Sequence, residues 1–416
     1  MARRPFHGWR IVGAGALIQF LQSSLLLQSF GAYVAVLQED RGWSKTELSF
    51  AAALHQMEAA ILGPVLGWFI DRFGPHGVIR AGVVTLALGF MLMSQIESLA
   101  AFYAAFIVVA LGSSMCGFMP LNVSMIYWFE RKRGRALSTV SFGLALGGIA
   151  VPAVAWCMAT WGWRATAFGS GLLILLLGLP LALLMRGRPA LYGQHPDGEP
   201  LAATPSQLPE IEAEKRSRDF TAREALRTRA FWLLSLGHGF ALFVVTAVNV
   251  HAITHLKEGL GYAVEEAALF IMLMTLAQIG GIAFGAAIGD RFEKRLICAC
   301  CMLLHMTGLL CLTYANGAAM VVAFALLHGA AWGLRGPFMQ AIRAEYFGVS
   351  AIGMILGLSF MIIVVGQVGG PMIAGGLADL TGNYRAGFTV LAVLAGVGSL
   401  FFLLARKPVP PRAISR

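Results

Sequence analysis

The sequence predicts an all-α membrane protein, with twelve transmembrane helices arranged as two six-helix pseudo-repeats. Hydrophobic residues make up 58% of the 416 residues and charged residues only 12%, whereas soluble domains carry roughly 25% charged residues. The apolar runs reach about 20 residues or more, which is enough to cross about 30 Å of hydrocarbon as helices. They also lack the period-2 pattern of a membrane barrel. Finally, the tripeptide Asp-Arg-Phe occurs at residues 71–73 and again at 290–292, which indicates a duplicated unit.

The offset between the two tripeptides, 219 residues, recurs elsewhere in the chain. Pro152 is matched by Pro371 at the same offset, and Phe129 is matched by Phe347 at an offset of 218. A near-constant offset that links turns, charges and prolines predicts two long halves, because solenoid repeats are much shorter.

Each apolar run defines one predicted helix. The first half is predicted to contain helices at residues 10–36, 47–70, 76–95, 99–128, 134–159 and 164–185. The second half is predicted to contain helices at residues 230–256, 265–288, 294–315, 318–342, 351–378 and 385–405. Residues 186–229 form the one long polar stretch, and its prolines break helices. We interpret it as a cytoplasmic linker, with a regulatory role as the alternative. The predicted domains are therefore 1–185, 186–229 and 230–416.

The basic residues predict the orientation in the membrane. Twenty-five of the 31 Lys and Arg residues fall on the side that carries both termini. Because cytoplasmic loops carry an excess of Lys and Arg, both termini are predicted to be cytoplasmic, in a plasma membrane such as a bacterial inner membrane. The same asymmetry accounts for the net charge of +10 without nucleic acid. We predict a monomer whose partners are membrane lipid and a small-molecule substrate.

No cofactor and no enzymatic activity are predicted. All six cysteines fall in predicted helices, and Cys298, Cys300 and Cys301 are too close in sequence to converge on one metal ion. The chain shows no nucleophile constellation, no metal-ligand spacing and no phosphate-binding loop. It also lacks an ATP-binding domain, so a gradient or an exchange must supply the energy. A receptor, which would more commonly add a soluble domain, is a weaker alternative.

The turn after the second predicted helix carries a family resemblance. Residues 67–74 read Gly-Trp-Phe-Ile-Asp-Arg-Phe-Gly. Together with twelve helices in two halves, this motif resembles the major facilitator superfamily. The resemblance implies a conformational latch that shuts the cytoplasmic side and releases during transport, and the alternative is an anchor that only holds the short loop. The predicted latch residues are Gly67, Asp71 and Arg72, with Asp290 and Arg291 in the second, degenerate copy.

A narrower resemblance rests on four further segments. They are residues 7–10, 42–48, 127–136 and 162–165, and they resemble the monocarboxylate and oxalate–formate branch of the superfamily. That branch moves small organic anions, in some members with a proton. Eukaryotic monocarboxylate carriers have a lysine in the first helix and an Asp/Arg pair in the eighth. This chain has neither, so their anion site is not carried over.

Arg335 is the main candidate for substrate binding. It falls about midway along the predicted helix 318–342, where a charge costs at least about 2.5–3.5 kcal/mol and usually faces a cavity or a partner. Its forked guanidinium suits a carboxylate, and the alternative is a structural pair with Glu58. Polar side chains of other predicted helices are the remaining candidates for the substrate site: Gln19, Tyr33, Asn122, Asn249, His251 and His328.

Glu58 and His55 are the predicted proton-coupling residues. They are three residues apart and therefore share a helix face. Carboxylates in apolar surroundings and histidines can both exchange protons near neutral pH. One of the two is predicted to couple proton movement to anion binding at Arg335. The alternative is a neutralising Glu58–Arg335 bridge with no transport role beyond structure.

These features predict a secondary active transporter that works by alternating access. The predicted substrate is a small organic anion such as a monocarboxylate, moved with a proton or by anion exchange. The alternative is an efflux carrier of the same fold for drugs or other amphipathic solutes. A cavity selective for cations would favour an unpaired acid, whereas here Arg335 at least matches Glu58.

Overall fold

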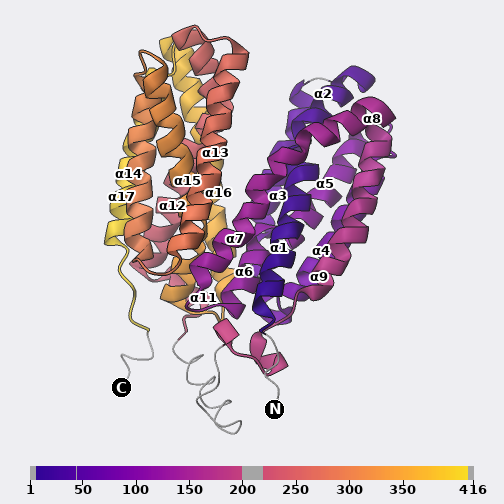
Figure 1. The fold of residues 1–416 in the computed structure, drawn as a ribbon, viewed down its shortest axis with the longest axis vertical. Helices are drawn as coiled ribbons and strands as arrows, with labels where there is room; N and C mark the ends of the chain where they lie inside the picture. The colour runs from indigo at the N-terminus through magenta and orange to yellow at the C-terminus, as the bar shows by residue number, and fades with distance from the viewer. Residues whose placement is uncertain (1–5, 44, 199–218, 411–416) are drawn as a thin grey trace. The chain divides into compact units, whose positions relative to one another are not determined.

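The computed structural model describes residues 6–43, 45–198 and 219–410 and is built of helices (Figure 1). These described ranges contain no β-strand. The chain divides into two compact units. The first unit comprises Met1–Ile211 with Ala351–Gly357, and the second comprises Glu212–Ser350 with Leu358–Arg416. The start of one late helix, α16, therefore groups with the first unit.

The helices of the first unit follow the predicted order but are interrupted at several places. The predicted helix 99–128 is divided at Gly117, and short 3-10 and π-helical turns lie at Gly147–Ala150 and Ile174–Gly178. The first predicted helix is interrupted by a π-helical turn at Ser23–Leu27 and continues to Arg41. The predicted break near 160–163 is a kink within the helix Val151–Leu173. Gly162 adopts φ 81° at this kink, a backbone conformation that favours glycine. The helices are α1 (Gly8–Gln22), α2 (Phe30–Arg41), α3 (Lys45–Phe73), α4 (Pro75–Met93), α5 (Leu99–Cys116), α6 (Phe118–Trp128), α7 (Arg133–Leu146), α8 (Val151–Leu173) and α9 (Leu179–Leu184).

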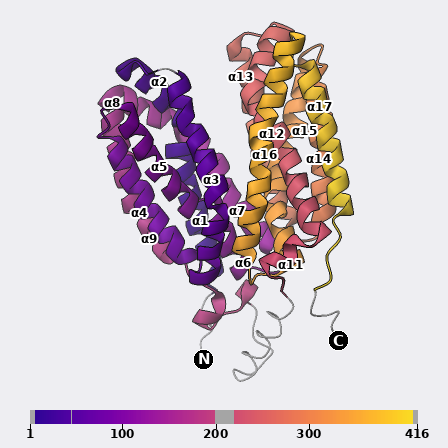
Figure 2. The same cartoon turned by 180° about the vertical axis from the view of Figure 1, so that it is seen from behind.

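The helices of the second unit lie within a few residues of their predicted bounds. In this unit α14 packs against α15 and α17, and α13 packs against α15 (Figures 1 and 2). The short helix α11 begins the unit, within the polar stretch 186–229. The helices are α11 (Ala222–Leu226), α12 (Arg229–Leu260), α13 (Val264–Ile288), α14 (Lys294–Thr313), α15 (Ala318–Phe347), α16 (Ile352–Thr381) and α17 (Arg385–Leu404).

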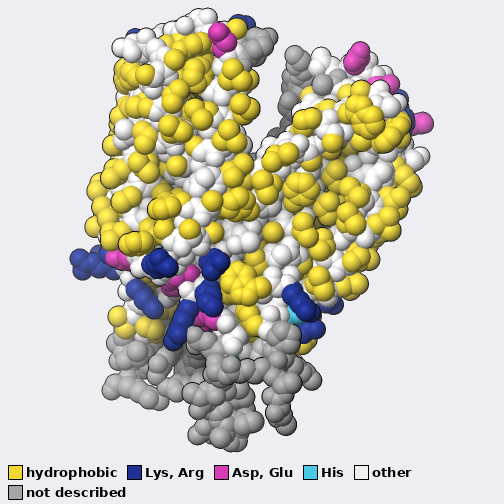
Figure 3. Space-filling view, in the orientation of Figure 1, with side chains coloured by type: hydrophobic (Ala, Val, Ile, Leu, Met, Phe, Trp, Pro, Cys, Tyr) yellow, Lys and Arg dark blue, Asp and Glu magenta, His cyan; other side chains and the backbone are white. Residues whose placement is uncertain are grey.

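Ten segments in the described part of the chain are long and apolar enough to cross a membrane. One of them, Arg133–Leu184, spans 52 residues, about twice the length that one crossing needs. In each unit hydrophobic side chains cover the sides of the helices, and Lys and Arg gather toward one end (Figure 3). These features indicate a multi-pass membrane protein. The count of twelve spans and the pseudo-repeat arrangement stay predictions.

Close helix packing depends on glycines at the contacts. A β-carbon built at Gly82 or Gly89 of α4 would lie 2.6–2.7 Å from backbone atoms of α5. In the second unit, β-carbons at Gly329 and Gly333 of α15 would overlap backbone atoms of α13. In a membrane, small residues let helices approach so that van der Waals contacts hold them together.

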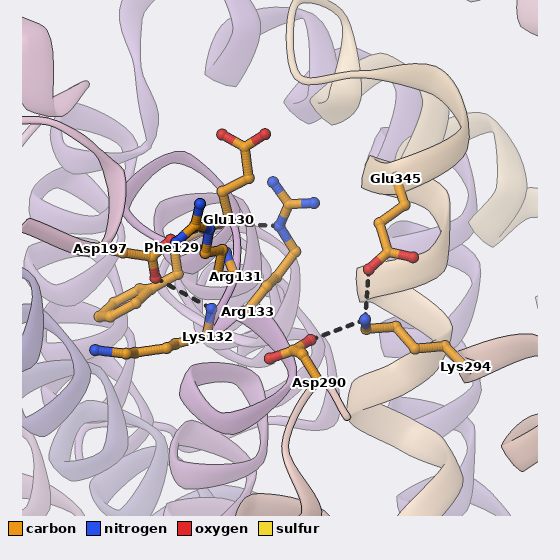
Figure 4. A network of polar contacts seen from close by, with 9 residues as sticks. All are labelled: Phe129, Glu130, Arg131, Lys132, Arg133, Asp197, Asp290, Lys294 and Glu345. Atoms are coloured by element: carbon orange, nitrogen blue, oxygen red, sulfur yellow. Dashed lines mark hydrogen bonds and ion pairs between the residues drawn. The ribbon is translucent and has the colours of Figure 1, made fainter. Parts of the chain in front are cut away.

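Two aspartates of the stretch 186–229 bind equivalent loops, one in each unit. The carboxylate of Asp197 accepts hydrogen bonds from the backbone N–H groups of Glu130, Arg131 and Lys132, at 2.7–3.1 Å (Figure 4). This loop joins α6 to α7.

The second aspartate, Asp219, acts on the loop that joins α15 to α16. Its carboxylate accepts from the N–H groups of Val349 and Ser350, both at 2.9 Å, and from the Ser350 hydroxyl at 2.7 Å. Val349 and Ser350 lie 219 residues after Glu130 and Arg131, which is the offset of the two Asp-Arg-Phe tripeptides. The two described parts of the polar stretch, 186–198 and 219–229, are therefore each bound to one of two equivalent loops.

Replacing Asp219 with asparagine is expected to destabilise the second unit. Asparagine keeps the size but removes the charge that strengthens three hydrogen bonds, so we expect a loss of about 1–3 kcal/mol. Thermal unfolding of the purified protein measures this as a lower melting temperature. The same change at the exposed Asp379 is the control and should leave the melting temperature unchanged. Equal behaviour of the two variants would contradict an anchoring role for Asp219.

Candidate functional site

The first Asp-Arg-Phe turn places Asp71 against the start of α16. Asp71 Oδ1 accepts a hydrogen bond from the Gly353 N–H, and Oδ2 accepts one from the Met354 N–H, both at 2.8 Å. The first N–H groups of a helix have no partner within the helix, and the helix dipole makes that end partly positive. The carboxylate satisfies two of these groups and complements the dipole. This contact lies within the first unit, to which Ala351–Gly357 belongs.

Four glycines allow α3 to come this close to α16. Gly63 and Gly67 on α3 face Gly357 and Gly353 on α16, and both pairs are four residues apart. A β-carbon at Gly353 would lie 2.6 Å from the Gly67 carbonyl oxygen and 2.8 Å from Asp71 Oδ1. A β-carbon at Gly67 would overlap the backbone of Gly353. The glycine of the motif is therefore needed for the approach that the aspartate uses.

Replacing Gly67 with alanine is expected to lower transport by about 10–100-fold. The added methyl group meets backbone atoms, which cannot rotate away, and overpacking of this kind costs about 1–3 kcal/mol. Initial rates of substrate exchange in proteoliposomes measure the effect.

The control for this substitution is Gly13→Ala on α1, where a β-carbon would meet no atom within 4 Å. Its transport should be unchanged, since alanine also favours the helix. Wild-type rates for Gly67→Ala would mean that close contact of α3 and α16 is not required.

The second Asp-Arg-Phe turn makes a different contact. Lys294 Nζ lies 2.8 Å from Asp290 Oδ1 and 2.5 Å from Glu345 Oε1, so it joins the start of α14 to the end of α15 (Figure 4). The two arginines that follow the aspartates, Arg72 and Arg291, are both exposed. Arg72 lies over the Trp68 ring, 5.2 Å from its centroid. Lys294 thus ties the second turn to the end of α15.

The predicted proton-coupling residues lie together on α3. Glu58 is half-buried, and its Oε2 accepts a hydrogen bond from the Ser114 hydroxyl of α5 at 2.9 Å. Its other oxygen, Oε1, is buried and has no hydrogen-bond partner among the described residues. His55 is half-buried one turn earlier. The pairing of Glu58 with Arg335 stays a prediction.

Three further predicted substrate residues are buried in the first unit. Gln19 lies on α1, Tyr33 on α2 and Asn122 on α6, and each is at most 3% exposed. Within the described ranges, Gln19 Oε1 and Asn122 Nδ2 lack a hydrogen-bond partner. Buried polar atoms without partners are rare in proteins, so these two atoms are available to a ligand or to water.

Arg335 is enclosed within the second unit. Its side chain on α15 is 1% exposed, and its Nε and Nη1 atoms find no hydrogen-bond partner in the described part of the chain. Its charge interacts with His238 of α12 and with the cysteines Cys298 and Cys301 of α14. A buried guanidinium with unpaired donors is costly unless an anion or water completes it.

His328 lies two turns before Arg335 on α15 and pairs with a histidine that the sequence did not single out. The Nδ1 atoms of His305 and His328 are 3.1 Å apart, and their ring centroids are 4.6 Å apart. Neither side chain is exposed. Both histidines also interact electrostatically with Arg335.

The second unit offers Arg335 no carboxylate from its own helix interiors. The seven Asp and Glu residues of 230–416 all lie at helix ends or in loops: Glu258, Glu265, Glu266, Asp290, Glu293, Glu345 and Asp379. Arg343, two turns after Arg335, is also buried, but it donates to the carbonyl oxygen of Met339 at 2.7 Å and to the Ser359 hydroxyl at 2.9 Å. Of these two buried arginines, Arg335 is the one with unpaired nitrogens.

Two predicted substrate residues lie far from this cluster. His251 is 13 positions after His238 on α12, or about 20 Å along the helix. Its Nε2 lies 3.0 Å from the Pro371 carbonyl oxygen, and its ring packs against Tyr384. Asn249 is exposed near the same end. The structure therefore brings His328, but not Asn249 or His251, toward Arg335.

A pocket of about 170 Å³ opens at that distant end of the second unit. It is lined by His255 and Glu258 of α12 and by Tyr384 and Arg385 near the start of α17, among others. Burial raises the pKa of the Tyr384 hydroxyl above its usual value, and the charges of Glu258 and Asp379 add to this effect. The sequence analysis did not predict this pocket.

Comparison with known proteins decides the family. A sequence profile of the Major Facilitator Superfamily matches residues 12–263 and 234–416. The chain belongs to the major facilitator superfamily. Monocarboxylate transporter 13 of Bos taurus is 27% identical over 412 residues, which cover 95% of this chain and 89% of that protein. The predicted resemblance to the superfamily and to its monocarboxylate branch is confirmed.

The chain is also similar to an efflux protein and to a solved symporter structure. The fujikurins efflux protein of Gibberella fujikuroi is 24% identical over 385 residues, covering 89% of this chain and 76% of that protein. The solved structure of the proton:xylose symporter XylE, bound to 6-bromo-6-deoxy-D-glucose, has a TM-score of 0.75 at 15% identity and covers 96% of both chains. This major facilitator protein is thus a transporter, and neither its fold nor its relatives belong to an enzyme family.

Some residues at the sites of this major facilitator protein were not predicted from its sequence. The spacing of Gly353 and Gly357 was a usable signal, because two glycines four apart in an apolar helix mark a helix contact. His305 gave no such signal, since a single histidine in an apolar run does not reveal its partner. Asp197 and Asp219 lay in a polar stretch where aspartates are expected in any case.

Proposed function

We propose that this protein is a secondary active transporter for a small organic anion, such as a monocarboxylate. It works by alternating access of its two halves, with proton symport or anion exchange. The observation that carries the proposal is the buried guanidinium of Arg335, whose Nε and Nη1 find no hydrogen-bond partner among the described residues. The helix interiors of 230–416 contain no carboxylate. A carboxylate substrate supplies the missing charge and fits the fork of the guanidinium.

The other predicted roles belong to the same proposal. Glu58 and His55 are the carriers of the coupled proton that the sequence predicts, and five polar side chains help to line the path or site of the substrate: Gln19, Tyr33, Asn122, Asn249 and His328. His251 completes this set at the far end of α12. Residues 1–185 and 230–416 form the two moving halves, joined by 186–229. The protein acts as a monomer in the plasma membrane, with both termini in the cytoplasm, as the distribution of Lys and Arg supports.

The latch role concerns the contact between α3 and α16. Asp71 stabilises the conformation in which it accepts from Gly353 and Met354, and the contact opens during the transport cycle. Gly67 allows the approach, and Arg72 lies next to it. Asp290 and Arg291 hold the corresponding place in the second copy, where Lys294 forms ion pairs with Asp290 and Glu345.

A second candidate function is efflux of an amphipathic solute. The relative described as a fujikurins efflux protein favours it, while the relative described as monocarboxylate transporter 13 favours the anion. Arg335 decides between them in our proposal, because a buried cation repels cationic drugs and attracts carboxylates.

A substrate panel in proteoliposomes tests the proposal. Purified protein is loaded with unlabelled lactate, oxalate or tetraphenylphosphonium, and uptake of the same labelled compound is followed at pH 6 and pH 7.5. We expect counterflow of at least one carboxylate and none of the lipophilic cation. Counterflow of the cation alone would favour the efflux reading and reject the anion proposal.

A further inference from the structure

The geometry of the His305–His328 pair determines which ring nitrogens carry protons. The two Nδ1 atoms are 3.1 Å apart, so one ring must donate and the other must accept. In neutral imidazole one nitrogen carries the proton and the other carries a lone pair. The ring that donates through Nδ1 therefore has a bare lone pair at Nε2.

Both Nε2 atoms are buried and lack a hydrogen-bond partner in the described ranges. One of them is consequently a buried basic nitrogen to which no group of the described residues donates. Adding a proton there converts this ring to imidazolium while the Nδ1 hydrogen bond stays in place. The pair can thus gain one proton without rearranging its ring contact.

Burial, and after it the positive charge of Arg335, oppose that step as long as no anion is bound in the second unit. Arg335 interacts with both rings, and a second positive charge beside a buried guanidinium is unfavourable. An anion on Arg335 removes this repulsion. Proton binding at the histidines and anion binding at Arg335 therefore favour each other, and the coupling is reciprocal by thermodynamic linkage.

The helices packed around the pair supply no competing acid. α13 from Ala267 to Ile288 and α17 from Ala386 to Leu404 contain no ionisable side chain. The interiors of the other three helices contribute histidines, arginines and thiols: His238, His251 and His255 on α12, Cys298, Cys300, Cys301 and Cys311 on α14, and Arg335 and Arg343 on α15.

We infer that the His305–His328 pair is the proton site of this transporter, and that it takes up its proton when a carboxylate binds to Arg335. The inference rests on the proposed anion transport and replaces Glu58 and His55 as the coupling residues. One proton adds to one Nε2, no bond to the substrate forms, and a monocarboxylate and its proton cross together without net charge.

Two transport assays on two variants test the inference. In His305→Asn and His328→Asn the amide stands in for Nδ1 but does not titrate. We expect His305→Asn to keep lactate counterflow at equal pH on the two sides. His328→Asn is judged by the ratio of its gradient-driven accumulation to its counterflow, because His328 also belongs to the proposed substrate site. Accumulation of lactate driven by an inside-alkaline pH gradient should fall at least about tenfold, because the driving proton has lost its site. Counterflow at equal pH also shows that a variant is folded.

Glu58→Gln and His55→Asn are the competing variants, and His76→Asn on α4 is the control for a histidine change elsewhere. All three should keep gradient-driven accumulation. Loss of accumulation in Glu58→Gln or His55→Asn, with normal accumulation in the His305 and His328 variants, would overturn the inference. Absence of counterflow in the wild-type protein rejects the proposed function itself.

A measurement on the wild-type protein covers the case in which these variants do not fold. Lactate is added to the purified protein in weakly buffered solution at pH 7, and proton uptake is read with a pH indicator dye. We expect about one proton taken up for each lactate bound, since lactate itself is fully ionised at this pH. Binding of lactate without proton uptake would contradict the inference.

Discussion

Replacing Arg335 with methionine is expected to abolish carboxylate transport without destabilising the substrate-free protein. Loss of a buried, charge-assisted contact to the substrate costs about 3–5 kcal/mol, so exchange should fall by at least about 100-fold. Methionine fills a similar volume and removes an unpaired buried charge, so the melting temperature should stay the same or rise. Lactate counterflow and thermal unfolding, measured on the same preparation, check both results.

Arg343→Met is the matched control for this substitution. Arg343 is buried on the same helix, and its guanidinium donates to Met339, Leu234 and Ser359. Methionine leaves those acceptors without a donor, so the melting temperature should fall. A similar fall for Arg335→Met would contradict the anion site, because it would show that Arg335 has a structural partner such as Glu58.

Replacing Asp71 with asparagine is expected to slow transport by at least about tenfold. Asparagine keeps one acceptor oxygen but loses the negative charge and the second acceptor, so one of the Gly353 and Met354 N–H groups loses its partner. Charge-assisted hydrogen bonds contribute about 1.5–3 kcal/mol, and each 1.4 kcal/mol shifts a conformational equilibrium tenfold. Initial rates of counterflow over a range of substrate concentrations measure the effect.

The corresponding change in the second copy, Asp290→Asn, separates a latch from a local ion pair. Asp290 pairs with Lys294 inside the second unit, so the latch proposal for Asp71 predicts that transport falls less in Asp290→Asn than in Asp71→Asn. Equal losses in the two variants would show that the two turns are equivalent, and would favour the view that each one only anchors its loop.

The helices could be predicted because their cause is local. An apolar run of about 20 residues must be helical in a membrane, and its length sets its bounds within a few residues. Gly162 was correctly placed at a break, since the apolar pattern stops there. The π-helical turn at Ser23–Leu27 was not predicted, because the apolar composition continues through it.

The contacts of the site were less predictable, because they join distant parts of the chain. Asp71 was predicted as a latch residue, but its partners lie 282 and 283 residues away, and no local pattern identifies them. Arg335 stood out as a charge in an apolar run, whereas its neighbour His305 became visible only through its contact with His328. Asn249 and His251 were grouped with Arg335 because helices were compared by position, and the length of α12 separates them.

Competition between a carboxylate and its neutral amide tests the central claim most directly. Labelled lactate is exchanged by the wild-type protein in proteoliposomes while unlabelled lactate or lactamide is added outside. The two competitors share their shape and differ in the charge that Arg335 is proposed to recognise. We predict that lactate competes and that lactamide does not, even at about 100-fold higher concentration. Equal competition by the two compounds would contradict recognition of an anion by Arg335.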